Sequence, residues 1–304
     1  MSLISLVIPV FNEEEVLSEL IERLVCSLKF SENYEIIFVN DGSLDNTFSL
    51  LLKAKKDNNN IKIINLSRNF GHQAAFTAGI NYAKGDFIIM MDADLQDPPE
   101  LIPEMYNKML ETESDIIYAK RIERNETCFK RIVIRLFHKV FEKLSQNNQG
   151  DTGNFCLMNR KSINAFLSLN EKNRYLPGLR YFIGFKQNFI EYKRQDRQKG
   201  KAKMSFWKLI ALAFDAIFSF SKLPLRVALI LGLIGFLLSL IGMCIVFYKK
   251  ITGDAITGWT SSMLSIFFFG SVQLIFLGIL GEYIYRIYKE TQNRPIYVIK
   301  DIYD

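Results

Sequence analysis

Residues 3–13 of the chain read LISLVIPVFNE, an apolar run of strand length that ends in an asparagine and an acid. The same pattern returns at residues 35–43, EIIFVNDGS, and at residues 87–97, FIIMMDADLQD. A strand that is apolar at nearly every position is buried on both faces, as in a parallel sheet that helices cover. These stretches therefore predict strands of an α/β domain whose polar residues gather where the strands end.

Working outward from these runs, strands and helices alternate as far as about residue 120. The expected strands are Leu3–Val10, Glu35–Val39, Ile61–Leu66, Phe87–Met91 and Ile116–Ala119, and the expected helices are Glu14–Leu28, Asn46–Lys56, Gln73–Ala83 and Pro99–Leu110. Asp45 is a candidate cap for the second helix, and Pro98-Pro99 can open the fourth. This alternation predicts βαβ units and a mostly parallel sheet with helices on both faces.

Two long stretches, 227–248 and 259–281, contain no Asp, Glu, Lys or Arg. Each is long enough for a membrane helix, which needs about 20 apolar residues. The segment between them is short, so the two helices are expected to form a hairpin. The first residues of the chain lack the basic start of a signal peptide and are expected to form a buried strand. The sequence thus argues against a wholly soluble protein.

The distribution of charge predicts an orientation in the membrane. The chain has 38 Lys and Arg against 32 Asp and Glu, a net charge of +6. Such an excess suits nucleic acid or an anionic membrane surface, and the apolar stretches favour the membrane, so no nucleic-acid partner is expected. Many basic residues fall in 193–208, before the first apolar stretch, whereas the connecting loop carries only Lys249 and Lys250. Because cytoplasmic flanks are rich in Lys and Arg, both ends of the chain are expected in the cytoplasm.

Two basic segments leave alternatives open. Residues 130–145, KRIVIRLFHKVFEKLS, place apolar side chains on one stripe of a helix and basic side chains on much of the remainder. This pattern predicts either a helix packed on the domain or an amphipathic helix at a membrane interface. Residues 193–208 form either a solvated loop or a segment drawn to anionic headgroups, and the neighbouring apolar stretches favour the second.

Asp92 and Asp94 are the strongest chemical signal in the sequence. Residues two apart in an extended segment point to the same side, so both carboxylates could reach one divalent cation. Two acids with no His or Cys nearby in the sequence suit Mg²⁺ or Mn²⁺ rather than zinc. An Asp-x-Asp pair alone is common by chance, but its place at the end of a buried strand favours a metal site.

Other kinds of site lack their signals. The cysteines show no paired spacing, which argues against a disulfide framework and a zinc site and fits a reducing compartment; they are Cys26, Cys128, Cys156 and Cys244. No Gly-x-x-x-x-Gly-Lys-Ser/Thr loop is present, and no Gly-x-Gly-x-x-Gly follows the first strand. The sequence therefore disfavours a P-loop nucleotide site and a Rossmann dinucleotide site. Because the apolar stretches hold nothing polar enough for an ion path, a channel or transporter is also disfavoured.

Four motifs resemble one known family. They are VIPVFNEEE (7–15), VNDGSLDNT (39–47), LSRNFGHQAAFTAGI (66–80) and MMDADLQDPPE (90–100). They are similar to the family 2 inverting glycosyltransferases, and more narrowly to the polyprenyl-phosphate glycosyltransferases, the group of dolichol-phosphate mannose synthase and bactoprenol glucosyltransferase. With the two C-terminal apolar stretches, the resemblance covers essentially the whole chain.

The resemblance implies a reaction and a place for it. It implies a GT-A-type domain that transfers one sugar, from UDP-glucose as the first expectation, to undecaprenyl phosphate with Mg²⁺ or Mn²⁺ as cofactor. The product would serve surface polysaccharide modification, such as that of the O-antigen of lipopolysaccharide, and the enzyme would be a multi-pass protein of the bacterial inner membrane. UDP-GlcNAc, a UDP-linked amino sugar or GDP-mannose are alternative donors, and homo-oligomerisation is left open. A processive synthase is disfavoured, because Q-x-x-R-W is absent, and a non-catalytic membrane-tethered scaffold is the alternative of another class.

The resemblance also divides the chain. The expected parts are a cytoplasmic glycosyltransferase domain (1–204), an interfacial segment (205–224), a first membrane helix (225–248), an outer loop (249–258), a second membrane helix (259–285) and a cytoplasmic tail (286–304).

Site residues follow from the matching motif positions. Those implied in donor binding are Pro9, Asn12, Glu13, Asp41, Asp92, Gln96 and Arg121. Asp92 and Asp94 match the metal-binding pair. Arg131 and Arg135 look like the site for the acceptor phosphate, and Arg197 resembles a basic motif that closes over both phosphates.

The chain departs from the family pattern at one motif. This branch often has Asp-x-Gly-Asp-Phe-Arg-Leu, where this chain reads DTGNFCL at 151–157, with Asn154 in place of the second acid and Cys156 in place of the arginine. Asn154 cannot remove a proton, so Asp151 remains a candidate base. A lipid phosphate has a second pKa of about 6, so it is largely ionised at neutral pH and hardly needs a base. The candidate catalytic residues are Asp94, Asp151, Asn154 and Arg197.

Overall fold

The structure is a computed structural model that describes residues 2–121, 152–172, 174–192 and 258–304, together with residues 230–232, 234, 235, 237, 241, 244 and 248. The chain divides into two compact units. Unit 1 comprises Met1–Ser205 and Pro295–Asp304, and unit 2 comprises Phe206–Arg294. The chain therefore leaves unit 1, forms unit 2 and returns to unit 1.

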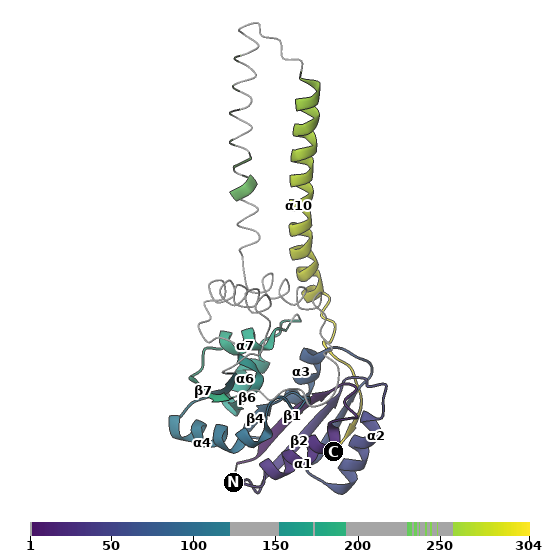
Figure 1. Cartoon of the computed structure of the whole chain (residues 1–304), viewed down its shortest axis with the longest axis vertical. Coiled ribbons are helices and arrows are strands. Elements are labelled where there is room, and N and C mark those ends of the chain that lie inside the picture. The colour runs from purple at the N-terminus through teal and green to yellow at the C-terminus, as the bar shows by residue number, and fades with distance from the viewer. Residues whose placement is uncertain are drawn as a thin grey trace. The chain divides into compact units, whose positions relative to one another are not determined.

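Unit 1 is built on one sheet of eight strands (Figure 1). The strands are β1 (Ile4–Val10), β2 (Tyr34–Asn40), β3 (Ile61–Leu66), β4 (Phe87–Met90), β5 (Ile116–Arg121), β6 (Thr152–Asn159), β7 (Gln187–Tyr192) and β8 (Ile299–Tyr303). Their order is β7-β5-β6-β4-β1-β2-β3-β8. All seven residues of β1 are buried, as expected for a strand covered on both faces.

The sheet is mixed but mostly parallel, which confirms the predicted class. β1 pairs in parallel with β2 and β4, β2 with β3, and β5 with β7. β6 runs antiparallel between β4 and β5, and β8 runs antiparallel to β3. As a result, β1–β5 and β7 all end at one edge of the sheet, where β6 and β8 begin. We call this edge the rim.

Helices cover both faces of the sheet, as predicted (Figure 1). They are α1 (Leu17–Ser27), α2 (Thr47–Asp57), α3 (His72–Tyr82), the 3-10 turn η1 (Pro99–Leu101), α4 (Ile102–Thr112), α6 (Arg160–Leu167) and α7 (Leu176–Phe182). α1, α2 and α4 share one hydrophobic core with β1, β2 and β3. α3 packs on the other face so closely that a Cβ at Gly79 would collide with the side chains of Val7 and Val39.

Several elements differ from the sequence prediction. The prediction that the first helix begins at Glu14 is wrong: it begins at Leu17, because the carbonyl of Glu13 accepts the N–H groups of Val16 and Leu17 in a turn. The prediction that Asp45 caps α2 is also wrong, because Asn46 holds that position. β6, β7 and β8 were not anticipated.

Asp45 still serves the start of α2 from one residue further away. Its Oδ1 accepts the N–H of Thr47 at 3.0 Å, and its Oδ2 accepts the N–H of Glu14 at 3.3 Å. The carboxylate therefore satisfies an end-of-helix donor and at the same time ties the loop after β1 to the loop after β2.

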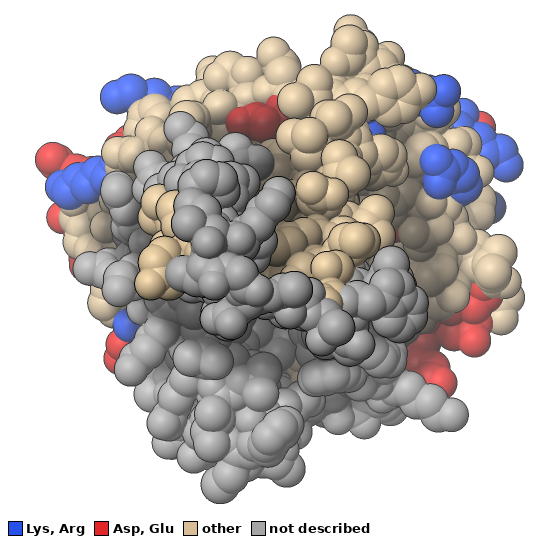
Figure 2. All heavy atoms as spheres, turned by 90° about the horizontal axis from the view of Figure 1, so that it is seen from above, with Lys and Arg blue, Asp and Glu red and all other residues tan. Residues whose placement is uncertain are grey.

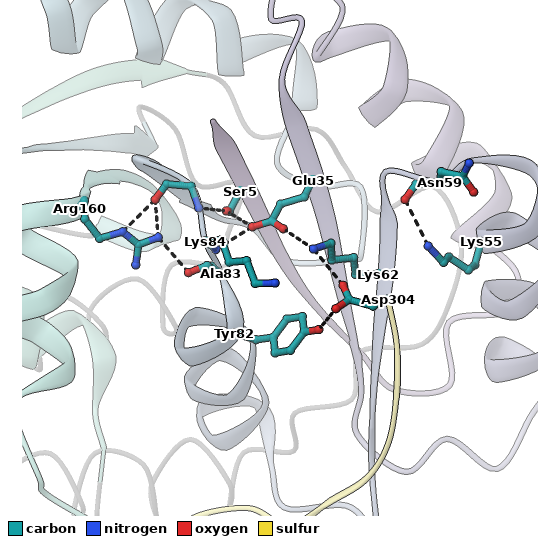
Figure 3. Close-up of polar contacts among 11 residues, drawn as sticks. Ser5, Glu35, Lys55, Asn59, Lys62, Tyr82, Ala83, Lys84, Arg160 and Asp304 are labelled. Atoms are coloured by element: carbon teal, nitrogen blue, oxygen red, sulfur yellow. Dashed lines mark hydrogen bonds and ion pairs between the residues drawn. The ribbon is translucent and has the colours of Figure 1, made fainter. Parts of the chain in front are cut away.

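The C-terminal strand β8 completes the sheet and ends in a polar cluster opposite the rim (Figure 3). The members, which we call the base cluster, are Ser5, Glu35, Lys62, Tyr82 and Asp304. Lys62 Nζ lies 3.0 Å from Glu35 Oε2 and 2.9 Å from Asp304 Oδ1. Tyr82 donates its hydroxyl to Asp304 at 2.5 Å, and Ser5 donates its hydroxyl to Glu35. Side chains from β1, β2, β3 and α3 thus meet the C-terminal segment in one network.

Unit 2 contains α10 (Trp259–Thr291). Its segment Phe268–Thr291 is long and apolar enough to cross a membrane, and it is the one such helix in the described part of the chain. The described residues between 230 and 248 are helical. A methyl group added at Gly232 would lie 3.9 Å from the ring of Phe276, and one at Gly235 would lie 3.9 Å from that of Phe269. These two glycines therefore lie against α10.

Several predicted segments fall on residues that the structure does not describe. They are the basic segments 130–145 and 193–208, the interfacial segment 205–224, the loop 249–257 and much of the first apolar stretch. In the end-on view of Figure 2, the described Lys and Arg side chains stand at the margins, beside Asp and Glu side chains. On this face the described Lys and Arg side chains do not gather into one patch.

Candidate functional site

The rim brings together polar residues that follow three neighbouring strands. β1 lies between β2 and β4, with Pro9 opposite Val39 and Val7 opposite Met90. The segments after these strands therefore leave the sheet side by side, which is where ligands bind in open α/β sheets. Pro9 itself lies inside β1 with its side chain buried.

Asn12 ties the loop after β1 to the loop after β2. Its φ of 53° lies in the left-handed region, which asparagine tolerates better than most residues. Its N–H donates to Ser43 Oγ at 3.0 Å, and its Oδ1 accepts the N–H of Leu44 at 2.8 Å. The N–H of Glu13 donates to Thr47 Oγ1 at 2.9 Å. The two loops are therefore held rigidly against each other at the position predicted for the nucleotide.

Asp41 ties the loop after β2 to the loop after β3. Its side chain is buried, and its two oxygens accept the N–H groups of Phe70 at 2.7 Å and Gly71 at 3.0 Å. Burial raises the pKa of Asp41, and the two backbone N–H groups offset only part of that effect. Each carboxylate oxygen carries a second lone pair, so the predicted contact with a base is compatible with this role.

Asp92 and Asp94 lie together at the rim, as predicted. β4 ends at Met90, and both acids are half-buried on either side of the buried Ala93. The backbone N–H of Gln96 donates to Asp94 Oδ1 at 3.3 Å, so the predicted third residue of this group lies beside the pair.

Asp92 has a histidine neighbour that the sequence analysis missed. His72 Nε2 lies 3.0 Å from Asp92 Oδ1, although the two residues are 20 positions apart in the sequence. The side chain of His72 is 45% exposed; partial desolvation lowers its pKa, but the carboxylates of Asp92, Asp41 and Asp94 outweigh that effect, and the pKa is raised. His72 opens α3 directly after the loop that follows β3. Its position between a predicted strand and a predicted helix, in the connection that leads away from the rim, was the signal that could have revealed it.

Asn154 contacts the same carboxylate from a different element of the fold. β6 starts at Thr152, and because it runs antiparallel to β4 its first residues lie at the rim. Asn154 Nδ2 donates to Asp92 Oδ1 at 3.2 Å. The structure therefore brings together Asp92, Asp94, Gln96 and Asn154.

A buried arginine supports the start of β6. The side chain of Arg180, from α7, is fully buried; its Nη1 donates to the carbonyl of Asn154 at 3.1 Å and to Cys156 Sγ at 2.7 Å, and its Nη2 donates to the carbonyl of Gly153 at 2.7 Å. Burial raises the pKa of the Cys156 thiol despite Arg180. Cys156, which stands where the resembling motif often has an arginine, thus contacts a guanidinium supplied by another element. Sequence reasoning missed Arg180 because arginine is seldom fully buried.

The remaining predicted residues belong to segments that start at the rim. Arg121 ends β5 opposite Tyr192, the last residue of β7. Tyr192 donates its hydroxyl to the buried Asp97, just after the Asp92–Asp94 pair. The last residues of β5 and β7 and the first residue of β6 therefore all lie at the rim. Four predicted residues lie outside the described residues: Arg131, Arg135, Asp151 and Arg197.

The donor set at the rim fits a hard divalent cation. Among the described residues, no group of three His, Cys, Asp or Glu side chains is arranged to hold a metal ion. Asp92 and Asp94 offer carboxylate oxygens, and Mg²⁺ commonly takes one or two carboxylates with water and substrate phosphates completing its shell. The residues present thus suit a cation shared between protein and ligand.

Comparison with known proteins gives consistent matches. The family model "Glycosyl transferase family 2" matches residues 5–167. An uncharacterized glycosyltransferase of Synechocystis sp. is 45% identical over 304 residues, covering 99% of this chain and 95% of that protein. A prophage bactoprenol glucosyl transferase homolog of Escherichia coli is 38% identical, covering 98% of this chain and 99% of that protein. The bactoprenol glucosyl transferase of Shigella phage SfV is 38% identical and covers 98% of both.

Solved structures share the fold. Glucosyl-3-phosphoglycerate synthase from Mycobacterium tuberculosis, in complex with Mn²⁺, UDP-glucose and phosphoglyceric acid, superposes with a TM-score of 0.53 at 14% identity, covering 72% of this chain and 78% of that chain. The same synthase with phosphoglyceric acid alone gives a TM-score of 0.52 at 16% identity, covering 72% of this chain and 79% of that chain. At this identity the likeness establishes a GT-A-like α/β fold.

Proposed function

Because the chain belongs to glycosyltransferase family 2, in its polyprenyl-phosphate branch, we propose that it transfers one sugar from UDP-glucose to undecaprenyl phosphate. The observation that carries the proposal is the meeting of Asp92, Asp94 and Gln96 at the rim. It is supported by near full-length similarity to bactoprenol glucosyl transferases and by fold neighbours that hold Mn²⁺ with UDP-glucose.

The residues at the rim are suited to receive the donor. Asp92 and Asp94 would hold Mg²⁺ or Mn²⁺, which when bound neutralises charge on the departing diphosphate. The hydrogen bonds of Asn12 and Asp41 fix three loops before any ligand arrives, so little ordering is required on binding. Pro9, Glu13, Gln96 and Arg121 complete the proposed donor site.

The acceptor side needs positioning more than proton removal. A phosphate monoester with a second pKa near about 6 is largely ionised at neutral pH, so its oxygen can attack without a strong base. We assign Arg131, Arg135 and Arg197 to neutralising and placing that phosphate. Asn154 in place of an acid is compatible with this chemistry, and Asp151 stays the candidate for any remaining base role. Attack from the face opposite the nucleotide inverts the anomeric carbon.

The return of the chain to unit 1 supports the proposed membrane hairpin. β8 follows α10 in sequence, yet it pairs with β3 in the same sheet as β1–β7. If α10 crosses the membrane, the chain must cross once more before it, and 225–248 is the apolar stretch available. The contacts of Gly232 and Gly235 with α10 agree with this.

We therefore propose a multi-pass inner-membrane enzyme with both ends in the cytoplasm. Its domain would be 1–204, its interfacial segment 205–224, its helices 225–248 and 259–285, and its tail 286–304. A cysteine introduced at Thr257, in the loop 249–258, should then react with an impermeant reagent on intact cells. Labelling only after lysis would reverse the orientation.

The decisive experiment offers the purified protein several donors with undecaprenyl phosphate. Each assay contains Mg²⁺ or Mn²⁺ and one donor: UDP-glucose, UDP-GlcNAc, a UDP-linked amino sugar or GDP-mannose. The mass of the lipid product is determined by mass spectrometry. We expect a lipid heavier by one hexose with UDP-glucose. A product with another donor alone would change the proposed substrate, and no product with any donor would favour the scaffold.

A further inference from the structure

We propose that His72 and Asn154 are positioning residues that clamp the Asp92 carboxylate for the cation and nucleoside diphosphate, an inference that rests on the proposed function. His72 Nε2 lies 3.0 Å from Asp92 Oδ1, and Asn154 Nδ2 donates to the same oxygen at 3.2 Å. The two donors come from α3 and β6, so they approach Asp92 from separate elements. A carboxylate held from two sides keeps one orientation, and a ligand-binding site gains from such preorganisation.

The imidazole of His72 is itself held in place. Asp41 fixes the backbone immediately before it, by accepting the N–H groups of Phe70 and Gly71. The ring of Phe76, one helical turn further along α3, packs edge-on against the imidazole with 4.8 Å between ring centroids. Asp41 therefore helps to position Asp92 indirectly, because it holds the backbone next to His72, and His72 contacts Asp92.

Asn154 is placed by the register of the sheet. β4 and β6 pair with Met90 opposite Cys156, and two residues further along the same antiparallel register put Asp92 opposite Asn154. Arg180 fixes this end of β6 by donating to the carbonyls of Gly153 and Asn154. The guanidinium is fully buried and its Nε has no hydrogen-bond partner, so burying Arg180 costs free energy. The fold bears this cost where Arg180 holds the start of β6.

The clamp gives a reason for the amide at position 154. A carboxylate in its place would set a second acid against Asp92, at a rim that already holds Asp41 and Asp94. Like charges in that arrangement repel. The amide instead donates a hydrogen bond, so the departure from the family motif turns a repulsive neighbour into a supporting one.

The test compares two variants of His72 in the full-length protein. Gln can present an N–H close to the position of Nε2, whereas Phe keeps an aromatic ring against Phe76 and removes the donor. Mn²⁺ affinity is measured by electron paramagnetic resonance without nucleotide, and UDP affinity by calorimetry at saturating Mn²⁺. Asn81→Ala is the control. Asn81 lies on α3, like His72, but its side chain bonds to Thr77 and Tyr297 and not to the rim carboxylates.

We expect His72→Phe to weaken Mn²⁺ binding by roughly tenfold, the size of one hydrogen bond to a charged group. His72→Gln should restore most of the loss, and Asn154→Leu should cause a smaller one, because its donor lies further from Asp92 Oδ1. Thermal unfolding of the His72 variants should match that of Asn81→Ala. UDP affinity should fall in parallel.

The outcomes separate the clamp from the proposed function. Equal Mn²⁺ affinity in His72→Phe and the unaltered protein would overturn the clamp, as would His72→Gln failing to differ from His72→Phe. If the unaltered protein bound Mn²⁺ but not UDP, the proposed donor would fall while the clamp was still judged by the Mn²⁺ affinities. If the unaltered protein bound no Mn²⁺, the clamp would fall with the site it serves.

Discussion

Asp41 at the rim and Glu35 in the base cluster are two buried carboxylates at opposite ends of one sheet, and they respond to burial in opposite ways. Their exposures are nearly equal, 3% and 4%. Burial is the largest influence on the pKa of each and raises it. In Glu35 the hydroxyl of Ser5, the N–H of Lys84 and the ammonium of Lys62 outweigh burial, and the pKa is lowered. In Asp41 the two backbone N–H groups do not outweigh burial, and the pKa of this acid stays raised.

The difference separates a stabilising end of the sheet from a functional one. Glu35 has a cation 3.0 Å away and two further donors, so its charge strengthens the fold. In Asp41 the two backbone N–H groups and the charges of His72 and Arg68 offset only part of the effect of burial, so ionising this acid costs stability. Such a cost is expected at a functional site whose acids are arranged to bind a ligand.

The largest expected effect is at the rim. Asp94→Asn should lower sugar transfer by about a thousandfold, because a neutral amide is a poor ligand for the cation that neutralises the leaving diphosphate. The thermal unfolding midpoint should stay unchanged. Turnover is measured by mass of the lipid product, with Asp57→Asn, an exposed acid at the end of α2, as the control. Undiminished turnover would remove Asp94 from the metal site.

Glu35→Gln at the base should show the reverse pattern. The amide sets a donor against Lys62 and removes the ion pair, which we expect to cost about 2 kcal/mol and to lower the unfolding midpoint by roughly 4–8 °C. Turnover below the transition should be preserved. Lys55→Met is the control, because Lys55 lies on α2 and makes an exposed hydrogen bond to the carbonyl of Asn59 (Figure 3). A loss of turnover without a loss of stability would break the distinction between rim and base.

These two regions also differ in how well the sequence predicts them. Asp41, Asp92 and Asp94 follow long apolar runs, so their place at the ends of buried strands could be predicted from the sequence. The base cluster depends on Asp304, which lies more than 200 residues from Tyr82 in the sequence. No local pattern records such a pairing.

The strands that were missed have a physical reason in common. β8 reads IKDIY and β7 reads QNFIEY, and both lie at edges of the sheet with exposed residues, so neither has a continuous apolar run. β6 reads TGNFCLMN; its first residues belong to a motif with candidate catalytic residues, and only its second half is apolar, so a strand was not predicted there. Asn154 was predicted as a site residue, but its contact with Asp92 depends on the pairing of β6 with β4, and that of His72 depends on the start of α3, so the spacing of residues in the sequence does not reveal either contact.

Arg131 and Arg197 are proposed to bind the acceptor phosphate, and both lie outside the part of the chain that the structure describes. Arg131→Ala and Arg197→Ala should each raise the apparent KM for lipid phosphate by about tenfold or lower kcat similarly, since each removes a charge-assisted hydrogen bond. The unfolding midpoint should not move. Lys56→Ala, an exposed cation on α2, is the control of equal charge. Unchanged kinetics in both variants would place the acceptor site elsewhere.

The smallest expected effect is a difference in pH dependence, and it tests the comparison directly. Folding lowers the pKa of Glu35 below its ordinary value of 4.5, so its contribution to stability is full above about pH 4.5 and is lost as pH falls through the folded pKa. The unfolding midpoint of the unaltered protein minus that of Glu35→Gln should therefore shrink on acidification. Folding raises the pKa of Asp41 above its ordinary value of 3.8, so its charge costs stability above the folded pKa, and the cost is relieved as pH falls through it. The corresponding difference for Asp41→Asn should move in favour of the unaltered protein. Two differences that change in the same direction as the pH falls from about 7 to below the folded pKa of Glu35 would show that the two buried acids do not differ in the way the structure indicates.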